Sequence, residues 1–161
     1  DRAAALMILA HRHAGSGAAA EALAAFETRY QNDPLVFDKW FQVQAGIPGP
    51  TAVDRVRSLM SHPAFSIANP NRVRSLIGTF STANQTGFHR ADGAGYMFFA
   101  DTILDIEKRN PQVAARLATG FRSWRSLEAG RQEKARAALL KLAATTNLSA
   151  DLRDIVERTL A

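Results

Sequence analysis

Apolar side chains recur along this chain at intervals of three and four residues, the period of a helix that buries one face. Strand-like alternation is scarce by comparison. The stripes are Leu23, Phe26 and Tyr30; Val36, Trp40 and Val43; Val53, Val56 and Leu59; Val73, Leu76, Ile77 and Phe80; Tyr96, Phe99, Ile103 and Ile106; Val113, Leu117, Phe121 and Trp124; Leu139 and Leu142; and Leu152, Ile155, Val156 and Leu160. Such a succession of stripes predicts an all-α protein.

Polar residues before prolines mark several predicted helix starts. Asp33-Pro34, Asn69-Pro70 and Asn110-Pro111 each place a short polar side chain where it can accept a free N–H of the first helical turn. Proline fits the next position because its N–H is not needed there. Further predicted caps are Ser16, Thr51 and Ser149. Thr51 is followed three residues later by Asp54, a looser form of the capping box.

The predicted helices begin near residues 16, 33, 51, 70, 92, 110, 128 and 149. Successive starts lie roughly 16 to 22 residues apart, so two helices fill the period of about 33–47 residues found in helical-hairpin arrays. We expect a single helical domain over residues 1–161, with antiparallel helical hairpins stacked as a short curved superhelix. A compact helical bundle is the alternative.

Composition narrows the possible chemistry. The chain has 161 residues and no cysteine, which excludes disulfides, thiolate–zinc sites and a cysteine nucleophile. The lack of cysteine fits a cytoplasmic protein, and no apolar run approaches the ~20 residues of a membrane span. The opening DRAAALMILAHRHAG has no initiator Met and no basic segment before its apolar run, so we expect a cut through a longer protein rather than a signal peptide.

The net charge of +5 is unevenly placed. Residues 107–161 hold 11 Lys and Arg against 6 Asp and Glu, whereas residues 1–106 hold 9 of each. Such a bias is compatible with an independent scaffold that binds nucleic acid or a protein partner. Solvated faces of basic helices are favoured instead, because Trp and Tyr are not interleaved with the basic residues as a stacking platform requires. We therefore expect no nucleic-acid partner.

The segment FHRADGAGYMFF, residues 88–99, places His89, Arg90 and Asp92 beside two glycines. No Ser or Cys nucleophile accompanies them, so a catalytic triad is not supported. Asp92 instead occupies the position of a cap for the helix whose stripe begins at Tyr96. Phe88 is expected to pack back over that helix, with His89 and Arg90 in the connecting loop. We assign no catalytic residue.

Metal-binding and acid–base patterns are also weak. His11 and His13 lie two residues apart, so their side chains point to opposite sides of a helix. The pattern H-E-x-x-H does not occur, and we assign no metal ligand in this chain. Two carboxylate pairs have helical spacing: Asp101 with Asp105, and Asp151 with Asp154. We expect these pairs on solvent-exposed faces.

The arginines behind the Asn-Pro caps are the more informative residues. Arg72 and Arg74 follow Asn69-Pro70, and Arg116 follows Asn110-Pro111. Arg74 and Arg116 each adjoin an apolar residue, so we expect them to border the core. A partly shielded arginine either forms a structural ion pair or lines a concavity that receives an anionic or carbonyl group. Spacing alone favours structural pairing.

Four long segments together carry a resemblance. They are NDPLVFDKWFQVQA, HPAFSIANPNRVRSLIGTF, FHRADGAGYMFFADTILDIEKRNPQVAARL and FRSWRSLEAGRQEKARAAL. In this order they resemble the C-terminal portion of the bacterial aminopeptidase N family, the zinc metallo-aminopeptidases of the thermolysin-like gluzincin group. The resemblance covers essentially the whole chain.

This resemblance implies a non-catalytic part of a longer enzyme that removes N-terminal amino acids from peptides. The implied part is the end of a helical superhelix that covers the active-site cavity and lines the substrate channel. Zinc and its ligands belong upstream, so no cofactor is expected in this chain. The implied partners are the upstream catalytic domain and the peptide substrate. Arg74 in NPNRVRSLIG and Arg116 in NPQVAARL match the basic residues of that channel.

The first helix carries a further expectation. If this chain continues a longer superhelix, Leu6, Met7, Ile8 and Leu9 would normally pack on helices upstream of it. An apolar patch left open at this helix is expected to favour self-association.

Overall fold

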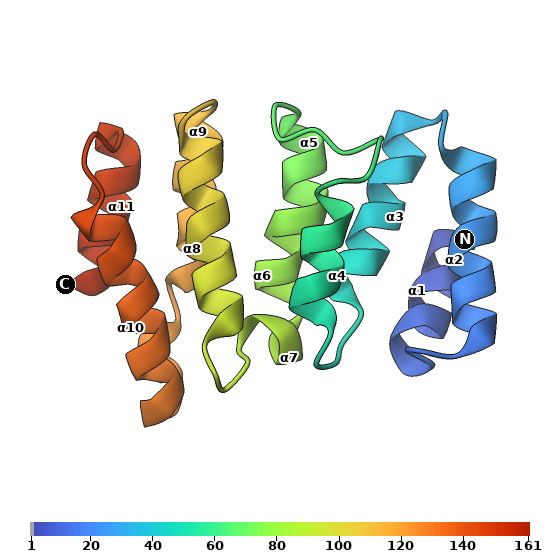
Figure 1. The fold of residues 1–161 in the computed structure, drawn as a ribbon, viewed down its shortest axis with the longest axis horizontal. Coiled ribbons are helices and arrows are strands. Elements are labelled where there is room, and N and C mark those ends of the chain that lie inside the picture. Colours follow the sequence, from blue (N-terminus) through green and yellow to red (C-terminus); the bar gives the residue numbers. More distant parts are fainter. Residues whose placement is uncertain (1) are drawn as a thin grey trace. The chain divides into compact units, whose positions relative to one another are not determined.

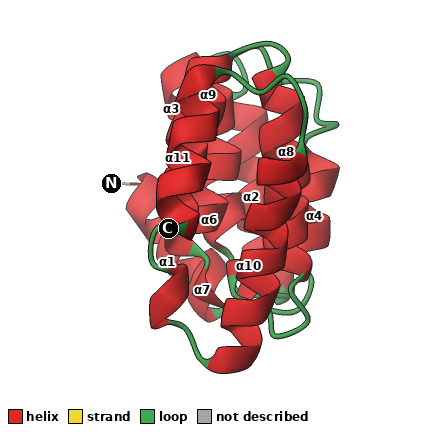
Figure 2. Cartoon of the chain, turned by 90° about the vertical axis from the view of Figure 1, so that its left-hand side faces the viewer, coloured by secondary structure: helices red, strands yellow, loops and turns green. Residues whose placement is uncertain are grey.

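The computed structural model describes residues 2–161, and all regular structure in that range is helical (Figure 2). The predicted all-α class is therefore confirmed. The described chain forms two compact units, one ending at Gly87 and the other running from Phe88 to Ala161. No helix of residues 2–161 is both long and apolar enough to cross a membrane.

The first unit is built around a buried central helix. Its elements are α1 (Arg2–Arg12), α2 (Gly17–Tyr30), α3 (Pro34–Gly46), α4 (Ala52–Leu59), α5 (Pro70–Val73), a π-helical segment (Arg74–Gly78), α6 (Thr79–Ala83) and α7 (Gln85–Phe88), whose last residue opens the second unit. Helix α3 packs against α1, α2, α4, α6 and the π-helical segment (Figure 1). Successive long helices run in opposite directions, as predicted for helical hairpins.

The second unit has fewer and longer helices. They are α8 (Ala94–Glu107), α9 (Pro111–Ala118), α10 (Ala129–Ala144) and α11 (Ala150–Leu160), with 3₁₀ turns at Thr119–Phe121 and Trp124–Ser126. Helix α8 packs on α9 and α10, and α11 packs on α9 and α10. The short 3₁₀, π and α7 elements were not predicted, because segments of three to five residues carry no measurable apolar period.

The predicted caps are confirmed with one clear exception. The side chains that accept a first-turn backbone N–H are those of Ser16, Asp33, Asn69, Asn110 and Ser149. Thr51 precedes α4 as predicted but makes no capping hydrogen bond. Its hydroxyl oxygen instead accepts from the guanidinium of Arg55 at 3.4 Å. The predicted capping box at Thr51 is therefore wrong.

The core of the first unit is centred on aromatic side chains. In the first unit, Phe37, Trp40 and Phe41 on α3 pack against one another and around His62, with ring centroids 5.0–5.7 Å apart. Phe37 and Phe41 lie outside the predicted stripe of this helix but are fully buried. The stripe missed them because α3 is enclosed on more than one face.

Arg72 is a buried charge in the first unit, with its side chain 8% exposed. Its Nε donates to the carbonyl of Ala64 at 3.0 Å, and one terminal nitrogen donates to the carbonyl of Pro34 at 3.0 Å and to the Asp38 carboxylate. The guanidinium also lies 5.5 Å from the centroid of Phe41. One side chain thus joins the start of α3, the loop before α5 and the aromatic core.

We predict that Arg72→Met destabilises the protein by about 3–5 kcal/mol, because it leaves the Asp38 carboxylate buried without its partner. Arg74→Met is the matched control: Arg74 is exposed, and its replacement is expected to change stability by less than about 0.5 kcal/mol. Urea denaturation followed by circular dichroism measures both. Equal stability of the two variants would contradict the structural role of Arg72.

Candidate functional site

The two arginines predicted for a substrate channel are held by capped helix starts. Asn69 accepts from the backbone N–H of Asn71 at 3.0 Å and begins the segment that carries Arg74. Asn110 accepts from the N–H of Val113 at 3.2 Å and begins α9, which carries Arg116. The side chains therefore project from fixed backbone rather than from loops.

Arg74 is exposed, and its guanidinium donates to the side-chain oxygen of Asn71 on the preceding turn. The expectation that Arg74 borders the core is wrong. Val73 and Leu76 are fully buried on the other side of this helical stretch, and one residue step turns a side chain by about 100° away from such neighbours. The Asn71 contact leaves the remaining guanidinium donors directed to solvent.

Arg116 is also exposed, although Ala115 and Leu117 on either side of it are buried. Within residues 2–161 its guanidinium has no hydrogen-bond or ion-pair partner, so the structural pairing favoured by spacing is wrong for this residue. Arg116 belongs to the second unit and Arg74 to the first. Each presents a cationic, planar group with donors available for an anion or a carbonyl.

Residues 88–99 form a helix start. The carboxylate of Asp92 accepts from the N–H of Ala94 at 3.0 Å and pairs with Arg90. The hydrogen bond from the Ala94 N–H is the main cause of a lowered pKa of Asp92, and the hydrogen bond from Arg90 lowers it further. The capping residue itself is Gly93, whose φ of 77° is the left-handed region that glycine tolerates. Asp92 therefore accepts a first-turn N–H as a cap does, but it lies one position before the N-cap and not at the N-cap, as had been predicted.

Phe88 and His89 pack over this helix, as predicted for Phe88. The Phe88 ring lies 5.3 Å from Tyr96 and 5.1 Å from Phe99. His89 Nδ1 lies 2.7 Å from the Tyr96 hydroxyl, while its backbone carbonyl accepts from Arg131 at 2.6 Å. Burial and the nearby Arg131 charge lower the pKa of His89, and burial raises the pKa of Tyr96 to about 12. The His89–Tyr96 pair stabilises the packing of the loop before α8 on α8 itself.

The other histidines make separate contacts. His11 Nε2 lies 3.0 Å from the carbonyl of Val43. His62 accepts the N–H of Ala64 at Nδ1 and lies 2.9 Å from Glu27 through Nε2. In the described part of the chain, no three His, Asp or Glu side chains come together to hold a metal ion.

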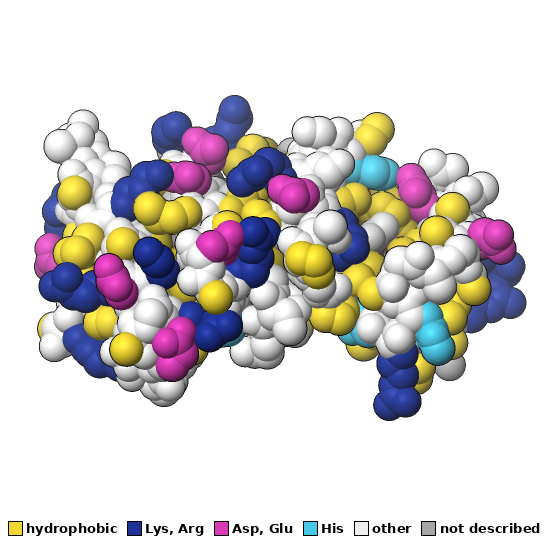
Figure 3. Space-filling model, turned by 60° about the horizontal axis from the view of Figure 1, so that its bottom comes forward, with side chains coloured by type: hydrophobic (Ala, Val, Ile, Leu, Met, Phe, Trp, Pro, Cys, Tyr) yellow, Lys and Arg dark blue, Asp and Glu magenta, His cyan; other side chains and the backbone are white. Residues whose placement is uncertain are grey.

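The candidate carboxylates lie on exposed faces, as expected, and several are paired with cations. Asp101 pairs with Lys141, Asp105 with Lys108 at 3.0 Å, and Asp154 with Arg158 at 2.8 Å. Figure 3 shows acidic and basic side chains interspersed over the face that it displays. These pairs favour solvated helix faces over a general acid–base site.

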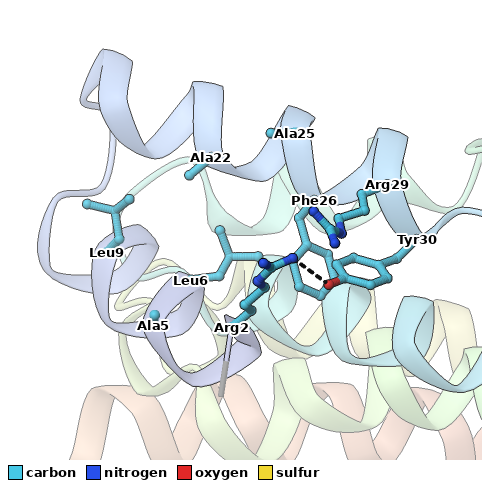
Figure 4. Close-up of a pocket in the computed structure, with 9 residues that line it drawn as sticks. All are labelled: Arg2, Ala5, Leu6, Leu9, Ala22, Ala25, Phe26, Arg29 and Tyr30. Carbon is cyan, nitrogen blue, oxygen red and sulfur yellow. Dashed lines mark hydrogen bonds between the residues drawn. The ribbon is translucent and has the colours of Figure 1, made fainter.

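An apolar depression lies between α1 and α2 and has a volume of about 340 Å³. Its lining residues are Arg2, Ala5, Leu6, Leu9, Ala22, Ala25, Phe26, Arg29 and Tyr30. Figure 4 shows Leu6 and Phe26 in its middle, Leu9 at one end, and the three polar side chains together at the other. This depression was anticipated only through the apolar character of the first helix.

The polar end of the depression is positively charged. Arg2 donates to the Tyr30 hydroxyl at 3.3 Å, and the Arg29 guanidinium lies 5.5 Å from the Tyr30 ring centroid. The hydrogen bond from Arg2 is the largest of the influences that lower the pKa of Tyr30. On the outer side of α1, Met7 is 43% exposed and Ile8 is 60% exposed, whereas Leu6 is buried. The predicted apolar patch is therefore present, without Leu6.

Comparison with protein families gives a match over the whole chain. Residues 1–161 match the family described as "Domain of unknown function (DUF3458_C) ARM repeats". Aminopeptidase N of Escherichia coli K12 is 43% identical over 136 residues, and aminopeptidase N of Haemophilus influenzae is 42% identical over 138 residues. These alignments cover 84% and 86% of this chain but only 16% of either relative.

A solved structure shows the same fold. The crystal structure of Legionella pneumophila aminopeptidase A in complex with aspartic acid aligns with 98% of this chain and 18% of its own, at 34% identity and a TM-score of 0.90. The sequence and structure matches together confirm the resemblance to the C-terminal domain of aminopeptidase N. The chain spans about a sixth of these relatives' length.

We predict that the protein loses stability as the pH falls below about 6.5, the ordinary pKa of histidine. Because the pKa of His89 is lowered in the folded state, the unfolded chain takes up this proton first, and acid favours unfolding until the folded pKa is passed. When the melting temperature is measured from pH 7.5 to 5, His89→Gln is expected to remove the part of its decrease with falling pH that comes from His89. His13→Gln, at an exposed position, is the control; an unchanged slope in His89→Gln would contradict the assignment.

Proposed function

Because the chain belongs to the DUF3458_C family of ARM-repeat domains, we propose that it is the C-terminal part of the helical domain of a cytoplasmic zinc aminopeptidase. The observation that carries the proposal is the whole-chain family match together with more than 40% identity to two proteins called aminopeptidase N. In the parent enzyme it would cover the active-site cavity. The zinc ion and the groups that cleave the peptide would belong to the upstream catalytic domain.

The stacked helices of this chain support a role in lining the substrate channel rather than in catalysis. Stacked helical repeats build extended surfaces on which side chains from successive helices are displayed. Arg74 and Arg116 are suited to such a surface because both are exposed and both extend from helices with satisfied caps. In the proposed channel their guanidinium groups donate hydrogen bonds to backbone carbonyls or to the C-terminal carboxylate of a bound peptide.

We predict that Arg74→Ala and Arg116→Ala, made in the full-length enzyme, each raise KM for tetrapeptides by roughly five- to tenfold, the loss of about one charge-assisted hydrogen bond. KM for a single aminoacyl anilide should stay unchanged, because that substrate does not reach the distal channel. Arg153→Ala is the matched control, an exposed arginine on α11. The same KM shift for short and long substrates would remove both residues from the channel.

We also predict that the 161-residue chain alone hydrolyses no aminoacyl anilide, with or without added zinc, because the proposed catalytic groups lie upstream. A fluorogenic aminopeptidase assay at high protein concentration measures this, with the full-length enzyme as positive control. Zinc-dependent turnover by the chain alone would contradict the proposal that the catalytic groups lie upstream.

A further inference from the structure

We propose that a depression beside the last turns of α11 is a binding site for a small molecule that carries a phosphate group. The depression has a volume of about 380 Å³, which is within the range of small-molecule sites. Three arginines of its lining, Arg122, Arg125 and Arg158, belong to the basic last third of the chain. The whole lining lies in the second unit, and the site does not depend on the proposed function.

Two segments of the chain bring these side chains together. Thr119, Arg122 and Arg125 lie three residues apart along the stretch that contains the two 3₁₀ turns. In 3₁₀ geometry residues three apart eclipse one another, so these side chains share one face of the stretch. Asp154 and Arg158 lie four residues apart on α11 and share a face of that helix. The depression lies where these two faces meet.

Arg125 is held in position by contacts within the chain. Its guanidinium lies 4.7 Å from the centroid of the Trp124 ring. Its two terminal nitrogens donate to the carbonyls of Thr159 at 3.2 Å and Leu160 at 2.6 Å, and the Trp124 indole N–H donates to the same Thr159 carbonyl at 2.8 Å. A guanidinium has five N–H donors, so these two bonds leave donors for a ligand. A donor that is already ordered lowers the entropic cost of binding.

The other two arginines also have donors that the chain does not use. Arg122 is exposed, and within residues 2–161 its guanidinium has no hydrogen-bond or ion-pair partner. Arg158 donates to the Asp154 carboxylate through Nε at 2.8 Å, which leaves its terminal nitrogens for a ligand. The Arg158–Asp154 pair is exposed, and exposed ion pairs contribute little to stability. An anion can therefore compete for Arg158.

The charge of the depression favours a dianion. Its lining holds three guanidinium groups and one carboxylate, that of Asp154, so two positive charges are in excess. The two threonine hydroxyls of the lining already donate to backbone carbonyls, Thr119 at 2.6 Å and Thr159 at 2.7 Å. The donors available to a ligand are therefore those of the arginines. A phosphate monoester carries close to two negative charges at pH 7 and presents three acceptor oxygens, which guanidinium groups bind in pairs.

The experiment is a titration of the isotopically labelled chain, followed by NMR of its backbone amides and arginine Nε–H groups. The probes are glycerol 3-phosphate and the dicarboxylate succinate, which carry similar charge at neutral pH. We expect glycerol 3-phosphate to shift the Nε–H signals of Arg122, Arg125 and Arg158 and to bind about tenfold more tightly than succinate. Binding is expected to weaken as sodium chloride is added, because salt screens exposed charges.

Single substitutions identify the binding surface. Arg122→Gln removes an unpaired cation of the lining and is expected to weaken the binding of glycerol 3-phosphate by about tenfold. Asp154→Asn removes the competing carboxylate and is expected to strengthen this binding by about three- to tenfold, a gain that misfolding cannot produce. The control Arg153→Gln is exposed on α11 and lies outside the lining. It is expected to leave the affinity within about twofold.

Three outcomes would overturn the proposal. Equal binding of glycerol 3-phosphate and succinate would remove the preference for phosphate, and an unchanged affinity in Asp154→Asn would remove the charge argument. Equal losses in Arg122→Gln and Arg153→Gln would assign the binding to nonspecific adsorption of anions on basic helices. None of these measurements uses a peptide substrate, so failure here is distinct from failure of the proposed function.

Discussion

The buried guanidinium of Arg72 is the interaction on which the first unit most depends. Few buried groups in a protein carry a charge, and this one is stabilised by two backbone carbonyls, one carboxylate and two aromatic faces. These partners come from α3 and from the loop that leads into α5, segments far apart in the sequence. Asn84, also buried, joins the carbonyls of Ala45 and Ile47 to the backbone of Gly87 in a similar way. Polar side chains thus hold together segments that no regular backbone hydrogen-bond pattern connects.

The second unit relies on a different contact, in which Phe88 at the end of α7 packs its ring onto α8, the next helix of the chain. Phe88 fills the space beside Tyr96, Phe99 and Phe121, while Gly93 lets the chain turn into α8. His89 and Asp92, which together suggested chemistry, are occupied by Tyr96 and by the helix start. A motif with the composition of an active site can therefore be explained by packing and capping.

The features of this chain that suit its proposed function lie on exposed surfaces. Arg74 and Arg116 are exposed on helices with capped starts, and the depression between α1 and α2 combines apolar side chains with a positively charged end. In the proposed role, the two arginines would face a bound peptide. In that role the chain would contribute shape and electrostatic complementarity rather than reactive groups.

The sequence by itself determined the helical class, most helix starts and the family, because caps and apolar periods act over a few residues and leave a local record. Asn69, Asn110 and Ser149 cap where they were predicted to, and each predicted stripe is buried or half-buried. Only the tertiary structure decided that Arg72 is buried while Arg74 is exposed, that Phe37 joins the core, and that Arg2 and Arg29 meet at Tyr30. Those outcomes depend on which helices enclose a side chain from outside its own helix, and the helical period contains no information about that.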